Sequence, residues 1–207
     1  MKKTIAIIFA LILLNSLSVY AQDSDFSRIR YMGTSIFSLP TAATRSTFSY
    51  INDGGHSATL LSQAFWDNSI EVSMLRHMSG VEKDKNILNF KLQIIEEGEI
   101  IPAIAWGNAD INTQLGSKIS YVAATKHFDV FGVVAHAGMY KHPETRDQEP
   151  YFGLEKMVFP LIYIAAERTE DVNTFGIKLS PYPGLNLEIA QRDGSEEIYN
   201  LVYFRSF

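Results

Sequence analysis

Apolar and polar residues alternate with a period of two along most of the chain after residue 45. The stretch Asn86–Asp110 shows this most clearly, because Leu88, Phe90, Leu92 and Ile94 occupy every second position of its first arm. A period of two is the repeat of a β-strand with one apolar face. Acidic residues and a glycine at positions 96–99 interrupt the pattern, and a second arm follows. The stretch therefore predicts a β-hairpin.

The same unit repeats along the chain, and no sustained 3.6-residue period interrupts it. Proline and glycine lie in many of the gaps, as turns require. We count twelve strand-like runs, at residues 46–51, 57–65, 69–77, 86–95, 101–107, 117–126, 129–137, 150–156, 161–168, 173–179, 185–191 and 198–205. Because the ends of such runs are not sharply defined in sequence, ten or fourteen strands are also compatible with the pattern.

The connections between these runs alternate in length and charge. The short set comprises Trp66–Asn68, Glu96–Ile100, His127–Phe128, Met157–Pro160 and Ser180–Gly184. The longer, more charged set comprises Asn52–His56, Met78–Lys85, Asn108–Gly116, Gly138–Glu149, Thr169–Val172 and Arg192–Glu197, and contains 12 of the 23 acidic residues. Short turns at one end and longer loops at the other are typical of an outer-membrane barrel. The chain is therefore expected to be all-β, an antiparallel up-and-down transmembrane β-barrel with its longer loops outside the cell.

The first 21 residues have the three parts of a secretory signal peptide. Lys2 and Lys3 give a basic start, residues 4–14 form an apolar run, and Ala21 ends a plausible cleavage site. The apolar run is shorter than the roughly 20 residues that a membrane-spanning helix needs. We expect a signal peptide (1–21), an N-terminal periplasmic lead (22–45) and a barrel (46–207), located in the outer membrane after export.

Composition narrows the function classes. Removing residues 1–21, with Lys2 and Lys3, takes the formal charge from −5 to −7, which argues against nucleic acid as a partner. The chain has no cysteine, so disulfides and thiolate chemistry are excluded. Aromatic residues make up 12% of the chain, which suits a barrel but also a soluble periplasmic β-protein. Aromatics that would form an interfacial girdle lie near the short turns: Phe65, Trp66, Phe128, Phe159, Tyr182 and Phe207.

Charged residues also fall on the polar faces of the expected strands. In a barrel these faces line the lumen, where charges must pair or stay hydrated. The expected lumen charge network consists of Glu71, Lys91, Lys118, Glu155, Glu167, Lys178 and Glu188. A barrel of about twelve strands can be closed or can hold a narrow polar conduit. We favour the mostly closed form, because the sequence shows neither a long inserted segment nor a ring of charges of one sign.

Candidate catalytic and metal-binding residues are few. Only His136 lies inside an expected strand, since His77 is the last residue of its run. The Gly-x-Ser-x-Gly nucleophile motif does not occur. His136 and His142 lie six residues apart, and Glu144, Asp147 and Glu149 follow them. These groups could bind a hard divalent ion through oxygens, but they lack a defined ligand spacing and are interpreted as a solvated acidic loop. We therefore expect no catalytic residue, no metal and no cofactor. A lipid-modifying enzyme stays as an alternative, because catalytic groups need not be adjacent in sequence.

A set of structural residues suggests a family. It comprises Gly33, Pro40, Thr41, Ala42, Glu96, Glu97, Gly98, Pro102, Gly107 and Asp110. Together these positions resemble YjbH-like proteins, outer-membrane β-barrels associated with exopolysaccharide or capsule export, and this chain would be a single-barrel short form. The resemblance implies a non-enzymatic structural or accessory role in envelope or exopolysaccharide export. It also implies outer-membrane lipid, exopolysaccharide or export-machinery proteins as partners. The alternative function is a narrow outer-membrane channel for small polar or saccharide solutes.

Overall fold

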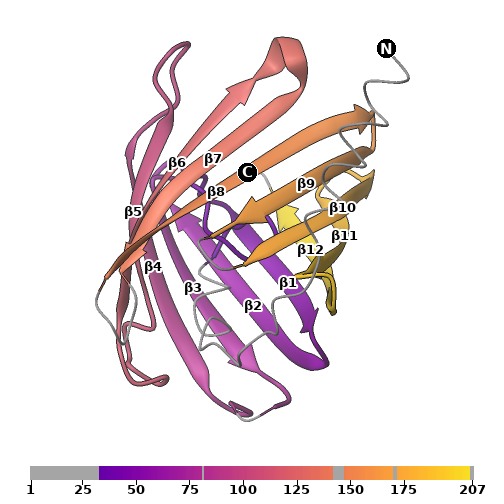
Figure 1. Ribbon diagram of the computed structural model, residues 1–207. Helices are drawn as coiled ribbons and strands as arrows, with labels where there is room; N and C mark the ends of the chain where they lie inside the picture. The colour runs from indigo at the N-terminus through magenta and orange to yellow at the C-terminus, as the bar shows by residue number, and fades with distance from the viewer. Residues whose placement is uncertain (1–32, 81, 142–146, 170–171, 206–207) are drawn as a thin grey trace.

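Twelve antiparallel strands follow one another around a ring, and the last pairs with the first, so the sheet closes into a barrel (Figure 1). This computed structural model describes residues 33–80, 82–141, 147–169 and 172–205. The strands are β1 (Ser46–Asp53), β2 (His56–Phe65), β3 (Ile70–His77), β4 (Asn86–Ile95), β5 (Ala103–Ala109), β6 (Ile119–Phe128), β7 (Val133–Lys141), β8 (Gln148–Phe159), β9 (Ile162–Arg168), β10 (Asn173–Tyr182), β11 (Leu185–Arg192) and β12 (Glu196–Arg205). Because every strand has two neighbours, closure removes the sheet edges at which chains aggregate. Within the described part of the chain, no helix is long and apolar enough to span a membrane.

The strand bounds follow the alternation of apolar residues, but several strands extend into the expected turns: β7 continues to Lys141, β8 to Phe159 and β10 to Tyr182. The run expected at 129–137 begins instead at Val133, because Asp129–Phe131 form the 3₁₀ turn η2. Gly132 ends this turn with a φ of 56°, a left-handed conformation that glycine adopts without steric cost. The turn expected at residues 127–128 is therefore wrong, since both residues belong to the end of β6.

Outward-pointing side chains of the barrel are mostly large and apolar. In β10, Phe175, Ile177 and Leu179 are exposed, whereas the intervening Gly176 and Lys178 are buried. The same inversion of burial recurs around the ring, for example at Val72, Met74, Leu154, Ile189 and Leu201. A strand that exposes its apolar face and buries its polar face is suited to hydrocarbon rather than to water. The expected assignment of strand faces is confirmed.

The two ends of the barrel differ. We call the end that holds the start of β1 and the end of β12 the terminal end, and the opposite one the loop end. Exposed aromatic side chains gather near the turns of the terminal end, at Phe65, Trp66, Phe128, Phe159 and Tyr182. Phe207, the sixth expected member of this girdle, lies outside the described residues. Aromatic rings at one rim of an apolar band mark a membrane–water interface.

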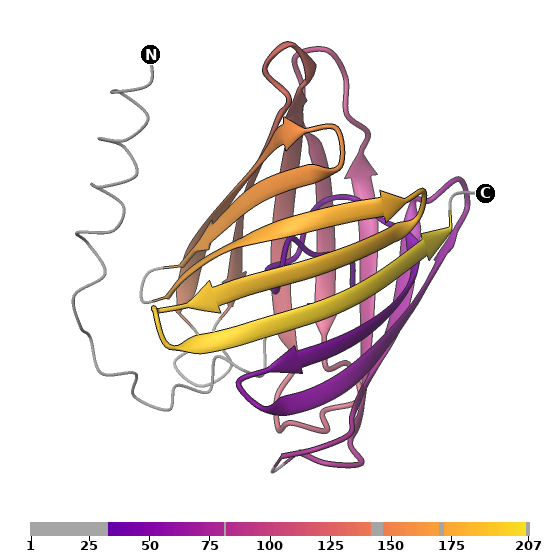
Figure 2. The same cartoon turned by 90° about the vertical axis from the view of Figure 1, so that its right-hand side faces the viewer.

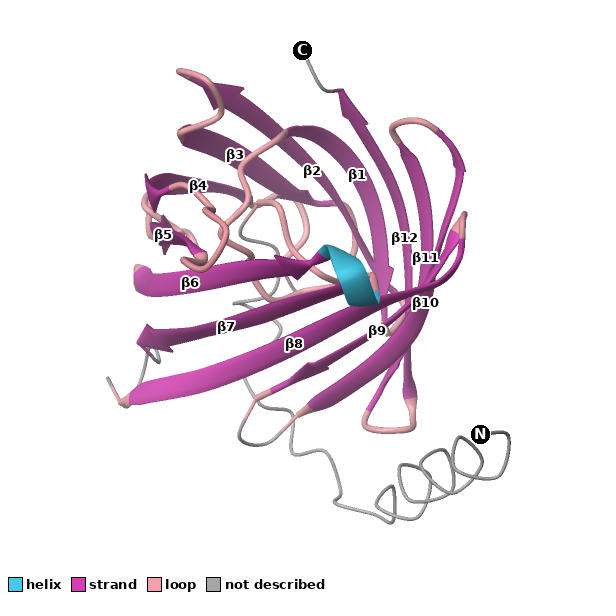
Figure 3. Cartoon of the chain, turned by 90° about the horizontal axis from the view of Figure 1, so that it is seen from above, coloured by secondary structure: helices cyan, strands magenta, loops and turns pink. Residues whose placement is uncertain are grey.

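The described chain begins inside the barrel. Residues 33–45, which we call the inserted segment, precede β1 and lie in the lumen (Figures 2 and 3). Ser35 and Pro40 form an isolated β-bridge, and the Ile36 N–H donates to the Leu39 carbonyl at 3.1 Å, so the segment turns back at residues 36–39. These four residues are all buried. The sequence interpretation placed residues 22–45 in a periplasmic lead, but their described part is packed within the barrel.

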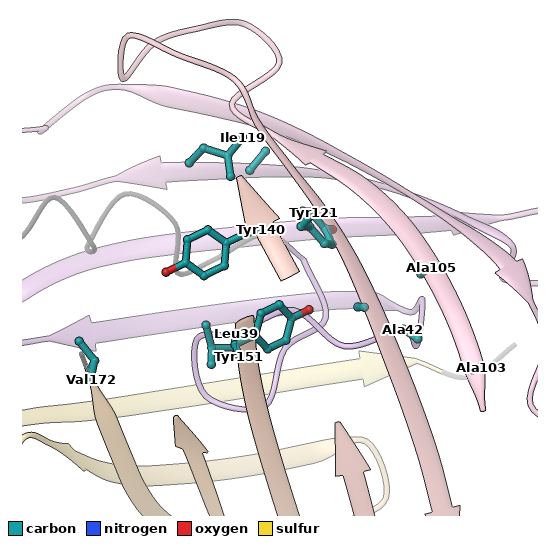
Figure 4. Packing of buried hydrophobic residues seen from close by; sticks show 11 residues of the cluster. Leu39, Ala42, Ala103, Ala105, Ile119, Tyr121, Tyr140, Tyr151 and Val172 are labelled. Carbon is teal, nitrogen blue, oxygen red and sulfur yellow. The ribbon is translucent and has the colours of Figure 1, made fainter. Parts of the chain in front are cut away.

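Buried apolar side chains from the inserted segment and the barrel wall form common clusters. Leu39 and Ala42 pack with small residues of β5 and β6 and with the rings of Tyr121, Tyr140 and Tyr151 (Figure 4). Ile36 and Phe37, at the tip of the segment, pack with Ala165, Ala190 and Ile198 of β9, β11 and β12. Small wall residues thus leave the space that the segment fills.

Two tyrosine rings cover glycines on neighbouring strands. Tyr121 of β6 pairs with Gly107 of β5, and Tyr151 of β8 pairs with Gly138 of β7. A Cβ built on Gly138 would lie 2.2 Å from the Tyr151 Cζ and 2.4 Å from the Val122 carbonyl oxygen. The absence of a side chain at each glycine therefore lets an aromatic ring lie flat against the barrel wall.

The Gly138→Ala variant is expected to lose about 1–3 kcal/mol of unfolding free energy, because overpacking here displaces backbone as well as a ring. Urea unfolding of the folded barrel in lipid or detergent measures this loss. Gly98→Ala is the matched control, since a Cβ at Gly98 meets no atom within 4 Å. Equal stability of the two variants would contradict the role given to the glycine–tyrosine pairs.

Candidate functional site in the lumen

Glu71 of β3 holds both ends of the inserted segment. Its carboxylate accepts hydrogen bonds from the Thr34 N–H at 2.8 Å, the Thr34 hydroxyl at 3.0 Å and the Arg45 N–H at 3.2 Å. The alternation of β3 turns this side chain inward, where only 1% of the residue is exposed. A buried carboxylate needs such donors to offset its lost hydration. The base of the segment is therefore fixed by a strand residue 37 positions away from Thr34.

Lys91 of β4 completes this contact. Its Nζ lies 3.1 Å from the Glu71 Oε2 and donates to the Thr34 and Thr41 carbonyls at 3.3 and 3.4 Å. Glu71 and Lys91 are register partners on neighbouring strands. The Lys91 ammonium thus lies between the barrel wall and the inserted segment, where it contacts one carboxylate and two backbone carbonyls.

Glu167 of β9 binds the tip of the inserted segment. Its Oε1 accepts the successive N–H groups of Phe37, Ser38 and Leu39 at 2.7, 2.9 and 3.0 Å, and its Oε2 accepts the Ser38 hydroxyl at 2.7 Å. Successive backbone N–H groups directed at one point form an anion-binding concavity. Here the chain's own carboxylate occupies it.

Three further hydrogen bonds join the segment to the wall. Thr125 accepts the Ala42 N–H at 3.0 Å, Tyr151 donates its hydroxyl to the Pro40 carbonyl at 2.9 Å, and Asn200 donates to the Phe37 carbonyl at 3.4 Å. Together with Glu71, Lys91 and Glu167, donors and acceptors from β3, β4, β6, β8, β9 and β12 bind the backbone of one short segment. Because these hydrogen bonds come from strands all around the lumen, they fix the position of the segment.

A second charge cluster lies across the lumen, on β7, β8, β10 and β11. The Lys178 Nζ lies 3.1 Å from the Glu155 Oε2 and 3.6 Å from the Glu188 Oε1. Glu155 also lies 3.1 Å from the His136 Nε2, and the Lys178 ammonium lies 5.3 Å from the centroid of the Phe37 ring. The cluster therefore contacts the opposite side of the inserted segment.

The structure brings together six of the seven residues expected in the lumen charge network, since Glu71, Lys91, Glu155, Glu167, Lys178 and Glu188 all point inward in these contacts. Lys118 does not join them. It is exposed in the loop just before β6, which begins at Ile119 and not at residue 117 as expected. Without a strand around it, the alternation does not direct its side chain inward.

The loop end of the lumen contains an ionic cluster that the sequence analysis missed. The Arg192 guanidinium donates a bidentate pair of hydrogen bonds to the Asp53 carboxylate, at 2.7 and 3.0 Å, and a third to the Glu196 carboxylate at 3.0 Å. Arg192 continues the inward alternation of Glu188 and Ala190, but the expected strand stopped at residue 191. Extending that run by one position would have found it.

The loop between β5 and β6 folds into the same end. Asp110 accepts the N–H groups of Gln114 and Leu115 at 2.7 Å each, which turns the loop inward. Leu115 is thereby buried against Ile51, Ala58, Leu60, Leu75 and Ile87 of the barrel wall. An apolar plug of side chains therefore narrows the loop end beside the Arg192 cluster.

A cavity of about 310 Å³, lined by both polar and apolar side chains, remains beside the inserted segment. It runs along β1 and β6–β12, and its wall includes Thr47, Ser49, Thr125, His136, Glu155, Tyr163, Lys178, Ser180, Asn186, Glu188 and Asn200. Phe204 and Arg45 lie where the cavity reaches the terminal end, with the Arg45 guanidinium 5.4 Å from the Phe204 ring centroid. The lumen is thus divided between a packed segment and a cavity of small-molecule size.

The family-like residues fall into three places. Gly33, Pro40, Thr41 and Ala42 belong to the inserted segment. Gly107 lies under the Tyr121 ring, and Asp110 turns the loop after β5. Glu96, Glu97, Gly98 and Pro102 form the connection between β4 and β5.

Glu97 ties this connection to the neighbouring hairpin. It accepts the His127 N–H at 2.7 Å and the Lys126 ammonium at 3.0 Å, and it also contacts the His127 ring. Burial alone would raise the pKa of Glu97, but these hydrogen bonds outweigh that effect and hold the pKa below its ordinary value. At neutral pH the carboxylate therefore stays ionised as a cross-link between two turns.

His136 has the hydrogen-bond partners of a catalytic base but not the surroundings. Its Nδ1 lies 3.0 Å from the Thr125 Oγ1, and Glu155 lies at its other nitrogen. This order of hydroxyl, imidazole and carboxylate is that of a nucleophilic triad. However, the Thr125 hydroxyl is buried beneath Ala42 and accepts its N–H, inside the lumen and away from the apolar outer face. The arrangement faces the inserted segment and the lumen rather than the surrounding lipid.

The acidic loop considered for metal binding is only partly described. Among the described residues, no group of three or more His, Cys, Asp and Glu side chains could hold a metal ion. His142 and Glu144 lie outside the described residues. Glu149 is described and accepts the Tyr140 hydroxyl across the pair formed by β7 and β8.

Comparison with known proteins places the fold. Neither a protein-family model nor a curated protein sequence matches the chain. The KdgM porin, solved in complex with disordered oligogalacturonate, superposes with a TM-score of 0.54 at 9% identity, covering 78% of this chain and 98% of that one. The NanC porin superposes with a TM-score of 0.52 at 11% identity, covering 77% and 99%. With its closed ring, apolar exterior and polar interior, the chain is a twelve-stranded antiparallel β-barrel of the outer membrane.

Proposed function

We propose that the barrel is a non-enzymatic, narrow channel for small polar solutes, saccharides among them. The observation that carries this proposal is the cavity of about 310 Å³ beside the inserted segment. Its wall offers hydroxyl, amide, carboxylate and ammonium groups together with the rings of Phe37, Tyr163 and Phe204. Hydroxylated solutes are bound by such a mixture of hydrogen-bonding groups and apolar ring faces.

The fold supports the same function. Twelve strands lie between small barrels filled by side chains and large porins with a wide aqueous channel. One of the similar structures is a porin in complex with oligogalacturonate, so a saccharide is a reasonable solute class for this lumen. The inserted segment then sets the width of the passage, and the strand side chains set its chemistry.

Planar bilayers test the channel. The purified barrel is expected to give steady single-channel steps, smaller than those of a wide porin because the segment occupies part of the lumen. Val202→Trp, which adds bulk to the cavity wall, should lower the step size, whereas Val122→Trp on the lipid-facing side should leave it unchanged. Silence from the parent barrel, with correct folding verified, would contradict the proposal.

A second candidate function is a structural or accessory role in exopolysaccharide export, as the resemblance to YjbH-like proteins implies. The occupied lumen favours it, because a scaffold does not need an open passage. In this case outer-membrane lipid and export-machinery proteins are the partners. Deleting the gene should then reduce surface polysaccharide without changing uptake of small sugars, while the channel predicts the opposite pair of results.

A further inference from the structure

Every basic side chain buried in the described lumen is matched by at least one carboxylate. Lys91 lies against Glu71 and two backbone carbonyls, behind the inserted segment. Arg192 is held by Asp53 and Glu196 at the loop end. A solute anion in the cavity would find no buried cation without a competing carboxylate among these groups.

The cavity itself carries an excess of acid in its buried part. Lys178 is its one buried basic residue among those described, and it is shared between Glu155 and Glu188. Glu155, Glu188 and Lys178 together have a formal charge of −1. Glu167 adds a further carboxylate behind the tip of the segment. Arg45 is also on the cavity wall, but its side chain is exposed at the terminal end, where water screens its charge.

The loop end is acidic as well. The described residues of the six longer connections include nine acidic and four basic residues. Charges of one sign around the mouth of a low-dielectric passage concentrate ions of the opposite sign there. The loop end and the cavity wall therefore favour the same kind of solute, through two separate sets of residues.

We infer that the passage selects cations and neutral hydroxylated solutes and rejects anions, including acidic sugars. This inference rests on the proposed channel function and names its solute class. Glu155 and Glu188 are the residues that determine the selectivity, because they outnumber the one buried ammonium of the cavity. Lys178 limits the effect by neutralising one of them.

The reversal potential of the full-length barrel across a KCl gradient tests this inference. The expected K⁺/Cl⁻ permeability ratio is on the order of threefold or more, since one unit charge in a narrow passage of intermediate dielectric shifts ion occupancy by at least that factor. Liposome swelling should likewise be faster with galactose than with galacturonate, which is similar in size but anionic.

Two variants change the charge of the group Glu155, Glu188 and Lys178 in opposite directions. The double variant Glu155→Gln/Glu188→Gln converts a formal charge of −1 to +1 and is expected to reverse the preference to Cl⁻. Lys178→Gln makes the same set more acidic and should raise the K⁺ preference. Glu99→Gln removes an exposed acid from the connection between β4 and β5 and serves as the matched control.

The outcomes separate this inference from the function on which it depends. Conducting channels that prefer Cl⁻, or an unchanged ratio in both charge variants, would overturn the selectivity but leave the channel standing. Folded barrels without conductance would overturn the channel itself and the selectivity with it. Heat-dependent gel mobility of each variant confirms that it has folded before it is tested.

Discussion

Deleting residues 33–43 is expected to raise the single-channel conductance several-fold. The inserted segment fills part of the lumen between β3 and β12, so its removal joins that volume to the cavity beside it. The barrel wall should stay closed, because the pairing of β1 with β12 begins at Ser46. Planar-bilayer recording of the deletion beside the parent gives the comparison.

A point variant tests the same idea with less disturbance. Glu167→Gln weakens the acceptor of three backbone N–H groups and one hydroxyl at the tip of the segment. We expect frequent transient steps towards the larger conductance, because the tip is released more often. Glu99→Gln should show none. Identical conductance in the deletion, the point variant and the parent would mean that the segment does not obstruct the passage.

The Lys91→Met variant is expected to have the largest effect on stability, a loss of about 3 kcal/mol in unfolding free energy. It leaves the Glu71 carboxylate buried without its cation, although Thr34 and Arg45 still donate to it. The double variant Lys91→Met/Glu71→Gln should recover part of the loss, because the remaining side chain is uncharged.

The control for this series is Lys85→Met. Lys85 pairs with Glu82 in an exposed loop at the loop end, where an ion pair contributes less than about 1 kcal/mol. Urea unfolding in lipid vesicles compares all the variants under one condition. Equal losses for Lys91→Met and Lys85→Met would show that the buried pair does not fix the segment.

The barrel was predictable from sequence because its strands are regular. Alternation in stretches such as Leu88–Ile94 and Phe175–Leu179 fixes both the strand and the direction of its side chains. The same rule identified six inward charges, because direction depends only on position within a strand. It failed at Lys118 and Arg192, because Lys118 lies just before the first residue of β6 and Arg192 is the last residue of β11.

The inserted segment could not be predicted in this way. Residues 33–45 form no strand of the barrel, and most of their bonds involve backbone N–H and C=O groups, which every sequence provides. Their partners lie far along the chain, at Glu71, Thr125, Tyr151 and Glu167. The sequence offers two signals, the short apolar run Ile36–Leu39 and the inward glutamates. Nothing in the sequence shows that these glutamates bind the backbone of that run. The expectation of a lumen without an inserted segment was wrong for this reason.

A single cross-link tests the central claim, that residues 33–45 lie within an outer-membrane barrel. The chain has no cysteine, so the pair Ala42→Cys/Thr125→Cys can be read without background. The Ala42 N–H lies 3.0 Å from the Thr125 Oγ1, which brings the two backbones close enough for a disulfide. Mild oxidation of the folded barrel is expected to join them, while the pair Ala42→Cys/Val122→Cys, with Val122 facing outward, stays reduced. Failure of the first pair to cross-link, or equal cross-linking of both, would contradict the structure of the lumen described above.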